Sequence, residues 1–417
     1  MNLKERFLKY ITFETQADPV SKEVPSSTGQ TCFAEVLLQE LKEIGIADVE
    51  MAEKSYIYGR IPSNLPGETQ PLRIAFIAHM DTAANLPGPG NTARIIENYD
   101  GNEIELASGI FLRPQEHKAL EDAKGDTLIV TNGKTLLGGD DKSGIAEIMT
   151  ALAYLMEHPE EPHGEVAFAF TPDEEIGGST KHIELEKLSA DVGYTLDGEE
   201  FGTIEYENFC NGAVQLEFRG IPCHPGYAKG IMVNALNLAA EFHGSLPTWD
   251  RPEHSCGYEG FFHLVMMEGN VEKSKSAYLI KDFDIEQYQK RKERIEELVT
   301  YFNHVYGEGT VTAEFLEGKM NMASLIVEHQ YVVDFAKEEI ANCGTAPLDM
   351  PLRGGTDGVA LTFMGLPCPN LGTGSYNHHS IFEFANLQKM EKCCELVLRL
   401  IKRYARESKT AKGIGSV

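Results

Sequence analysis

The chain has 417 residues, more than one hydrophobic core usually covers, so two domains or one elaborated domain are expected. Its 37 Lys and Arg stand against 64 Asp and Glu, and the net charge of −27 argues against nucleic acid or an anionic membrane as a partner. The charged opening residues and the lack of any run of 18 apolar residues predict a soluble, cytoplasmic protein. The eight scattered cysteines lack CxxC spacing and are expected to be reduced.

Three apolar runs, taken in chain order, predict buried strands. They are LRIAFIAHMD at 72–81, EVAFAFTPDE at 165–174 and DVGYTLDGE at 191–199. Between the first two, residues 140–158 carry apolar side chains at helical spacing and begin with two aspartates, which suit the positive end of a helix dipole. Strands that alternate with helices favour an α/β fold with a largely parallel sheet.

The pattern changes from about residue 209 to 320. AVQLEFRG and FHLVMMEGNVEKSKSAYLIKDFD resemble antiparallel strands, and IEQYQKRKERIEELVTYFNHV resembles a charged helix. We therefore predict a smaller α+β sandwich domain at 209–320, inserted between two parts of the first domain at 1–208 and 321–417.

Polar side chains gather where the predicted strands end. The set comprises His79, Asp81, Asp140, Asp141, Asp173, Glu174, Glu175, Asp197, His378 and His379. In open α/β sheets, ligands bind outside the carboxyl ends of the strands. Crowded carboxylates raise each other's pKa, so a bound cation is the simplest way to keep them ionised. Imidazoles and carboxylates without thiolates suit Zn²⁺, Mn²⁺ or Co²⁺.

Six motifs make the interpretation specific: HMD, GGDDKSG, PDEEIGG, DGEE, HPGYAKG and RGGTDG. In this order and spacing the chain resembles, over nearly its whole length, the dizinc metallopeptidases related to aminoacylase and carboxypeptidase G, and among them the tripeptide aminopeptidases. The resemblance implies a zinc-peptidase-like, three-layer α/β catalytic domain with an inserted lid or dimerisation domain. It also implies a homodimer that acts on tripeptides.

The resemblance implies a role for each residue of the site. His79 and Asp197 bind one zinc, Glu175 and His379 bind the other, and Asp140 bridges the two. Mn²⁺ or Co²⁺ are possible substitutes. Glu174 is the general base, which passes a proton from the attacking water to the leaving amine.

Other residues are predicted to support or bind the substrate. Asp81 lies on the same strand face as His79 and could accept the second ring N–H of that imidazole. The resemblance casts His224 as a donor to the developing oxyanion and places Asn321 at a substrate-contacting position. Arg353 could clamp a peptide carboxylate. Asp173 has no assigned task and is expected to be solvated or to accept from the backbone of its turn.

Several alternatives stay open. His378 could replace His379 as the ligand, and Asp140 with Asp141 could merely cap a helix. A dipeptidase, a carboxypeptidase or an N-acyl amino acid deacylase could use the same dizinc scaffold. A non-catalytic metal-binding protein would not need Glu174, and phosphoryl transfer would need a phosphate-cradling loop that the sequence lacks.

Overall fold

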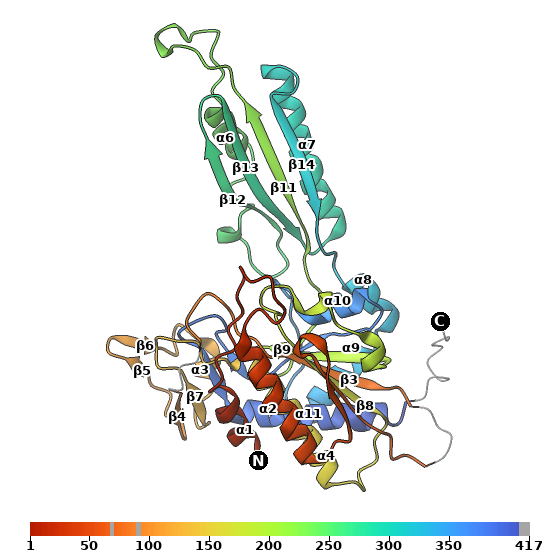
Figure 1. Cartoon of the computed structure of the whole chain (residues 1–417). Coiled ribbons are helices and arrows are strands. Elements are labelled where there is room, and N and C mark those ends of the chain that lie inside the picture. Colours follow the sequence, from red (N-terminus) through yellow and green to blue (C-terminus); the bar gives the residue numbers. More distant parts are fainter. Residues whose placement is uncertain (67–70, 89–92, 408–417) are drawn as a thin grey trace. The chain divides into compact units, whose positions relative to one another are not determined.

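The computed structural model describes residues 1–66, 71–88 and 93–407 and divides the chain into two compact units. The larger unit comprises Met1–Tyr206, Leu325–Met350 and Thr356–Val417, and the smaller unit comprises Glu207–Ser324 and Pro351–Gly355. The smaller unit includes Pro351–Gly355, and with it Arg353, although the sequence placed these residues in the other domain. Figure 1 shows the helices and strands of both units.

The larger unit is built on an eight-stranded mixed sheet. Its order is β1 (Asp48–Met51), β2 (Ile57–Ile61), β8 (Val166–Thr171), β3 (Ile74–His79), β9 (Val192–Gly198), β16 (Asn370–Gly372), β10 (Thr203–Glu205) and β15 (Leu348–Asp349). The central strand β3 runs parallel to β8 and β9, and β9 runs parallel to β16. The three strands predicted from apolar runs are therefore confirmed, and they are neighbours at the centre of the sheet.

Helices cover both faces of this sheet, as the buried side chains on β3 show. Ala75 and Ile77 belong to a core cluster with Leu188 near α5 (Leu185–Leu188) and Leu361 of α10 (Asp357–Phe363). Phe76 points to the opposite face, because side chains alternate along a strand, and its ring stacks with Tyr194.

The remaining helices of the larger unit complete its layers. They are α1 (Leu3–Tyr10), α2 (Thr28–Ile44), α4 (Gly139–Glu157), α9 (Tyr331–Asn342) and α11 (Leu387–Tyr404), of which α4 packs on β3 and β9 and is covered by α1 and α11. A short helix α8 spans Ala323–Ile326. Helix, sheet and helix form three layers, which confirms the predicted fold class.

The predicted helix at 140–158 is confirmed as α4, but its first turn departs from helical geometry. Asp140 and Asp141 have ψ angles of 106° and 36°, and regular helix begins after them. Gly138 precedes them with a φ of +78°, a conformation that favours glycine. This local geometry directs the two neighbouring carboxylates toward different partners.

A second small sheet in the larger unit lies in sequence for which we predicted no elements. Its strands are β17 (Ser375–Tyr376), β18 (Phe384–Asn386), β7 (Leu128–Val130) and β4 (Arg94–Ile96), and nearby in the chain are α3 (Lys118–Glu121) and the hairpin of β5 (Ile104–Ala107) with β6 (Ile110–Leu112). A cluster that includes Tyr99, Leu120, Tyr376 and Phe384 forms its core. The loop that carries His378 and His379 connects β17 to β18.

The smaller unit is a two-layer sandwich. Its antiparallel sheet has the order β12 (Phe261–Gly269), β13 (Lys273–Asp282), β11 (Cys210–Arg219) and β14 (Val311–Glu317). Helices α6 (Ala235–Gly244) and α7 (Ile285–Tyr306) pack on one face, as Figure 1 shows. Buried residues alternate along β11 with partly or fully exposed ones, so the other face of the sheet remains open.

Two absences concern only the described part of the chain. None of its helices has both the length and the apolar character that a bilayer crossing needs. All eight cysteines lie in this part of the chain and are free thiols.

Candidate metal centre

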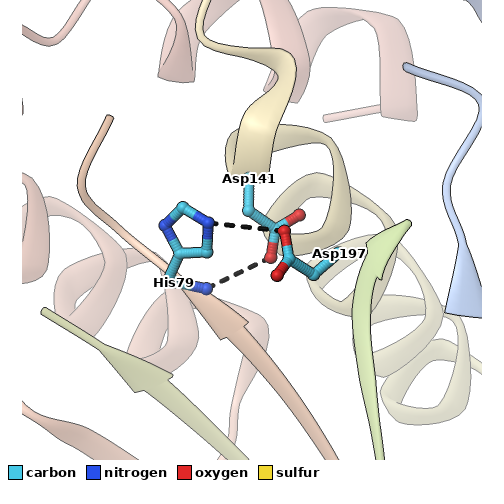
Figure 2. A group of neighbouring side chains, drawn as sticks. All are labelled: His79, Asp141 and Asp197. Atoms are coloured by element: carbon cyan, nitrogen blue, oxygen red, sulfur yellow. Dashed lines mark hydrogen bonds and ion pairs between the residues drawn. The ribbon is translucent and has the colours of Figure 1, made fainter. Parts of the chain in front are cut away.

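The candidate centre lies where the central strands of the larger unit end. His79 is the last residue of β3, Asp197 lies near the end of β9, and the turn with Glu174 and Glu175 follows β8. Because these three strands are parallel neighbours, their carboxyl ends share one edge of the sheet. Figure 2 shows His79 and Asp197 at their strand ends, with Asp141 approaching from the start of α4.

One half of the centre surrounds the ring of His79. Its Nε2 atom lies 2.9 Å from Oδ1 of Asp140 and 3.4 Å from Oδ1 of Asp197. The imidazole is 3% exposed, so these carboxylates meet it in a site that excludes most water. This is the set for which the sequence predicted one metal ion.

The other half surrounds the ring of His379. Its Nε2 atom lies 3.0 Å from Oδ2 of Asp140 and 2.9 Å from Oε1 of Glu175. The two oxygens of Asp140 therefore face two different imidazoles, which is the arrangement a bridging carboxylate needs. Nδ1 of His378 is 3.5 Å from Oδ2 of Asp140. His379 contacts both Asp140 and Glu175 at ion-pair distance, which favours His379 as the second ligand.

The donor atoms are close enough to bind metal. Two groups of three, His79 with Asp141 and Asp197 and His79 with Asp140 and Glu175, each offer ligand atoms within 4.8 Å of one another. The donors are imidazole nitrogens and carboxylate oxygens from partly or fully buried residues, a set that suits a divalent transition metal. The residues present therefore fit the metal that the sequence implied.

Asp140 and Asp141 are adjacent in the sequence, but their carboxylates make different contacts. Oδ2 of Asp141 accepts the backbone N–H of His79 at 3.1 Å (Figure 2), and its Oδ1 accepts the N–H of Gly144 at 3.2 Å. These bonds tie the start of α4 to the end of β3. Asp140 keeps both carboxylate oxygens for the imidazoles, so it is the better bridging ligand of the pair.

The centre contains more carboxylates than imidazoles, and bound protons compensate the excess negative charge. Burial raises the pKa of Asp197 to about 7, although the neighbouring imidazole of His79 opposes the rise. Hydrogen bonds to Asp140 and Glu175 raise the pKa of His379 to about 11. Because buried carboxylates hold protons or draw them onto imidazoles, cations of charge +2 could replace those protons.

Glu174 has the environment of a base whose proton affinity is increased. Burial raises its pKa well above the usual range; His79 opposes the shift and Asp197 adds to it. A carboxylate with a raised pKa accepts a proton more readily near neutral pH.

Asp81 supports the centre through more contacts than the sequence indicated. Its Oδ1 lies 3.4 Å from Nδ1 of His79, and its backbone oxygen lies 3.1 Å from the same atom. Its two carboxylate oxygens also accept the backbone N–H groups of Glu174 and Glu175, each at 3.0 Å. Asp81 therefore orients the imidazole and holds the turn that carries both glutamates.

Asp173 is not solvated, contrary to one of the two expectations for it. Its side chain is buried, and the carboxylate accepts the backbone N–H and hydroxyl of Ser26 and the amide of Gln30, the last at 2.7 Å. Gln30 in turn accepts the backbone N–H of Asp173 at 3.0 Å. Asp173 does accept from backbone: its main-chain oxygen accepts the N–H groups of Gly178 and Ser179 in its own turn, and its carboxylate accepts that of Ser26, almost 150 residues earlier.

Two further buried acids brace the centre and were missed from the sequence. Glu383 accepts the backbone N–H groups of Leu137, Gly138 and Asp140 at 2.6, 3.0 and 3.1 Å. Asp357 accepts hydroxyl donors from Thr171 and Ser179, which flank the glutamate turn. An acidic residue within the apolar run IFEFA is the signal that could have revealed Glu383.

The three residues predicted to bind substrate, His224, Asn321 and Arg353, all belong to the smaller unit. His224 is exposed in a turn, where its Nδ1 accepts the N–H of Gly226 at 3.1 Å. Asn321 accepts the N–H of Asn208 and donates to the oxygen of Phe283. The His224 contact stabilises a local turn, whereas the Asn321 contacts join distant segments of the smaller unit. The predicted substrate roles of both residues remain predictions.

Arg353 is also engaged within the smaller unit. Its Nη1 donates to the backbone oxygen of Gly257 at 2.5 Å and its Nη2 to the hydroxyl of Ser255 at 2.9 Å, while the guanidinium lies over the rings of Phe209 and Phe261. A substrate carboxylate would have to share these donors or replace their present partners.

Comparison with known proteins agrees with this geometry. Residues 132–403 match the model of "Peptidase family M20/M25/M40". Peptidase T of Clostridium perfringens is 45% identical over 401 residues, which cover 96% of this chain and 98% of that protein. The chain belongs to peptidase family M20/M25/M40. As a member of this family it is a metallopeptidase and therefore a hydrolase, and the resemblance predicted from the six motifs is confirmed.

Solved structures of the family share its fold. An aminopeptidase from Bacillus cereus superposes with a TM-score of 0.75 at 22% identity and covers 97% of this chain and 98% of its own. A tripeptidase from Staphylococcus aureus gives the same TM-score at 20% identity, with the same coverage. These similarities concern the M20 fold, whereas the arrangement of acids and imidazoles is read from this chain itself.

Proposed function

We propose that this metallopeptidase removes the N-terminal residue from tripeptides at a centre that binds two Zn²⁺ ions. The observation that carries the proposal is Asp140, whose two oxygens face His79 and His379, each of which also meets a second carboxylate. The relatives support the substrate, because the 45% identical protein is named peptidase T and the similar structures are an aminopeptidase and a tripeptidase.

The proposed ligand sets follow the two halves of the centre. His79 and Asp197 would hold one ion, Glu175 and His379 would hold the other, and Asp140 would contribute to both sites. When bound, the two ions polarise the scissile carbonyl and lower the pKa of water toward about 7. Mn²⁺ or Co²⁺ could replace Zn²⁺ in such a donor set.

Glu174 moves the proton in this mechanism. Its carboxylate takes a proton from the attacking water and delivers it to the nitrogen of the leaving peptide. Asp81 positions this base, since it accepts the backbone N–H of Glu174 at 3.0 Å. The raised pKa of the Glu174 carboxyl, caused by burial, suits both halves of the transfer.

Three residues of the smaller unit complete the proposal. His224 donates to the oxyanion that develops on the carbonyl, Arg353 binds a carboxylate of the peptide, and Asn321 contacts the substrate. His224 is exposed, and the hydrogen bond from the N–H of Gly226 is accepted by its Nδ1, so Nε2 is the ring nitrogen proposed to donate to substrate.

The same proposal includes a cytoplasmic location and a homodimer formed through the smaller unit. The open face of its sheet carries the exposed apolar residues Met266 and Leu316, which lie on β12 and β14. Exposed apolar side chains on a sheet face favour association. Light scattering of the purified protein tests the dimer, and a monomer at micromolar concentration would remove this part of the proposal.

A comparison of blocked and free peptides tests the reaction. The zinc-loaded protein should hydrolyse a free tripeptide such as Leu-Gly-Gly and release leucine, and it should act poorly on the N-acetylated tripeptide. Faster hydrolysis of the acetylated form would favour the rival deacylase, and release of the C-terminal residue would favour a carboxypeptidase. Metal analysis of the active protein should give two zinc ions per chain.

A further inference from the structure

We infer that Lys22 and Lys181 form a subsite for a substrate carboxylate in a cavity next to Glu175. The inference rests on the proposed function, because it assigns part of the peptide to a place beside the metal centre. The cavity has a volume of about 480 Å³ and lies entirely within the larger unit. Residues 19–24 form one wall, and residues of the turn and loop 173–181 form the other.

The cavity adjoins the centre through Glu175. This glutamate lines the cavity and also places its Oε1 atom 2.9 Å from Nε2 of His379. A ligand that fills the cavity therefore extends from the side of the centre at which the second metal ion is proposed. Pro19, Val24 and Ile176 supply apolar surface along which a peptide backbone could lie.

The two walls are joined by the buried carboxylate of Asp173. It accepts the backbone N–H of Ser26 at 2.8 and 3.0 Å, just beyond the first wall, and the amide of Gln30 at 2.7 Å. On the other wall, the backbone oxygen of Asp173 accepts the N–H of Gly178 at 2.7 Å. A cavity braced in this way is pre-formed, which lowers the entropy that a ligand must lose.

The charges at the cavity favour an anion. Lys22 and Lys181 are exposed, and within the described chain neither ammonium group has a carboxylate at ion-pair distance. Of the three lining acids, Asp173 is satisfied by Ser26 and Gln30, and Glu175 belongs to the metal centre. Only Glu23 is left to oppose two ammonium groups. This excess of positive charge favours the carboxylate of a peptide over its free amine.

A tripeptide carries such a carboxylate at a fixed distance from the bond that is cut. The two residues after the scissile bond span about 7 Å when extended, at roughly 3.3–3.6 Å per residue. A cavity lined both by Glu175 and by two lysines could therefore select the substrate by the position of this carboxylate. Arg353, which donates to Gly257 and Ser255, is the alternative partner that the proposed function names for this carboxylate, and the lysine variants below distinguish the two.

The experiment compares a tripeptide with its C-terminal amide and with a tripeptide amide that has an N-terminal Asp. Wild type should favour the free carboxylate at least tenfold in kcat/KM. The double variant Lys22→Met with Lys181→Met should lower this ratio to near 1, mainly through KM, while its kcat on the simple amide stays unchanged. Charge-assisted contacts that each contribute about 5- to 10-fold would account for such a loss. Lys42→Met, a change at an exposed lysine of α2 outside the cavity, is the matched control.

The outcomes separate the subsite from the reaction itself. A double variant that retains the wild-type ratio overturns the subsite even if tripeptides are cleaved as proposed. If wild type instead favours the Asp-containing amide, and the double variant loses that preference, the subsite is upheld and the carboxylate comes from a side chain. Equal activity of wild type on all three peptides overturns it. Failure of wild type to cleave any free tripeptide refutes the proposed function, whatever the variants do.

Discussion

The two principal sheets of this chain bury their strands in opposite ways. In the larger unit every residue of β3 and β8 is buried, because helices cover both faces. In the smaller unit buried residues alternate along β11 with partly or fully exposed ones, because α6 and α7 cover one face only. The first sheet can thus place polar groups only where its strands end, and the metal centre occupies that edge. The second sheet has a whole face on which polar and apolar residues are both tolerated.

The largest expected effect is on the edge of the first sheet. Glu174→Ala should lower kcat by about 10²- to 10⁴-fold, because it removes the group that transfers the proton. The bound metal and the unfolding midpoint should stay close to wild type, since Glu174 is not among the proposed ligands. Kinetics combined with metal analysis of the variant checks both parts. Normal turnover in this variant would falsify the assignment of the base.

A change within the buried sheet should affect stability instead. Phe168→Ala on β8 should lower the free energy of unfolding by about 3–5 kcal/mol, because the ring is fully buried. Urea unfolding measures the loss. In the smaller unit, Leu216→Ala on the helix-covered face of β11 should cost about 2–5 kcal/mol by the same reasoning.

Substitution of a buried acid that braces the centre should have an intermediate effect. Glu383→Gln keeps the shape of the side chain but weakens three hydrogen bonds to the backbone at Leu137, Gly138 and Asp140. Zinc affinity should fall about 10- to 100-fold, as for other residues that orient metal ligands. Titration with a competing chelator measures it. Glu339→Gln on α9 is the control, since Glu339 is buried but contacts Asn342 and Arg399 instead; an equal loss of affinity there would contradict the bracing role.

Glu147 on α4 allows a test of buried charge away from the proposed ligands. Burial raises the pKa of its carboxyl well above the usual value, and Cys393 opposes the rise only in part. The folded state then holds the proton more tightly than the unfolded state, so stability is full below the unfolded pKa and falls as pH rises above it. Glu147→Gln should therefore gain about 1 kcal/mol or more relative to wild type between pH 5 and pH 8. Urea unfolding at both pH values checks the sign; a gain at low pH instead would refute it.

The smallest effect is expected on the open face of the second sheet. Leu316 on β14 is 46% exposed, so Leu316→Ser should change the unfolding free energy of the monomer by less than about 0.5 kcal/mol. A drop as large as that of Leu216→Ala would show that this face is not open. Light scattering of the same variant also reports whether the face contributes to a dimer.

The sequence predicted well those features that depend on neighbouring residues. The strands before His79, Glu174 and Asp197 were evident as apolar runs, and α4 was evident from its period. Parallel strands bring their ends to one edge, so the gathering of polar residues there could also be foreseen.

Contacts between distant segments could not be foreseen in the same way. Glu383 reaches residues almost 250 positions earlier, and β4 and β7 are three-residue strands that pair within a sheet completed by β18. Arg353 was predicted to clamp a substrate carboxylate, and the sequence did not indicate that it also donates to Gly257 and Ser255. No local pattern marks such partners.

The bonds made by Glu383 also determine when the enzyme can first become active. Asp140 is translated more than 240 residues before Glu383, the carboxylate that fixes its backbone. The second imidazole, that of His379, is made almost as late. A ribosome-bound chain that lacks residues 379–383 has only half of the centre, however well its central sheet has formed. Peptide hydrolysis must therefore await synthesis of residues 379–383, and fragments truncated before residue 379 should be folded in part yet catalytically silent.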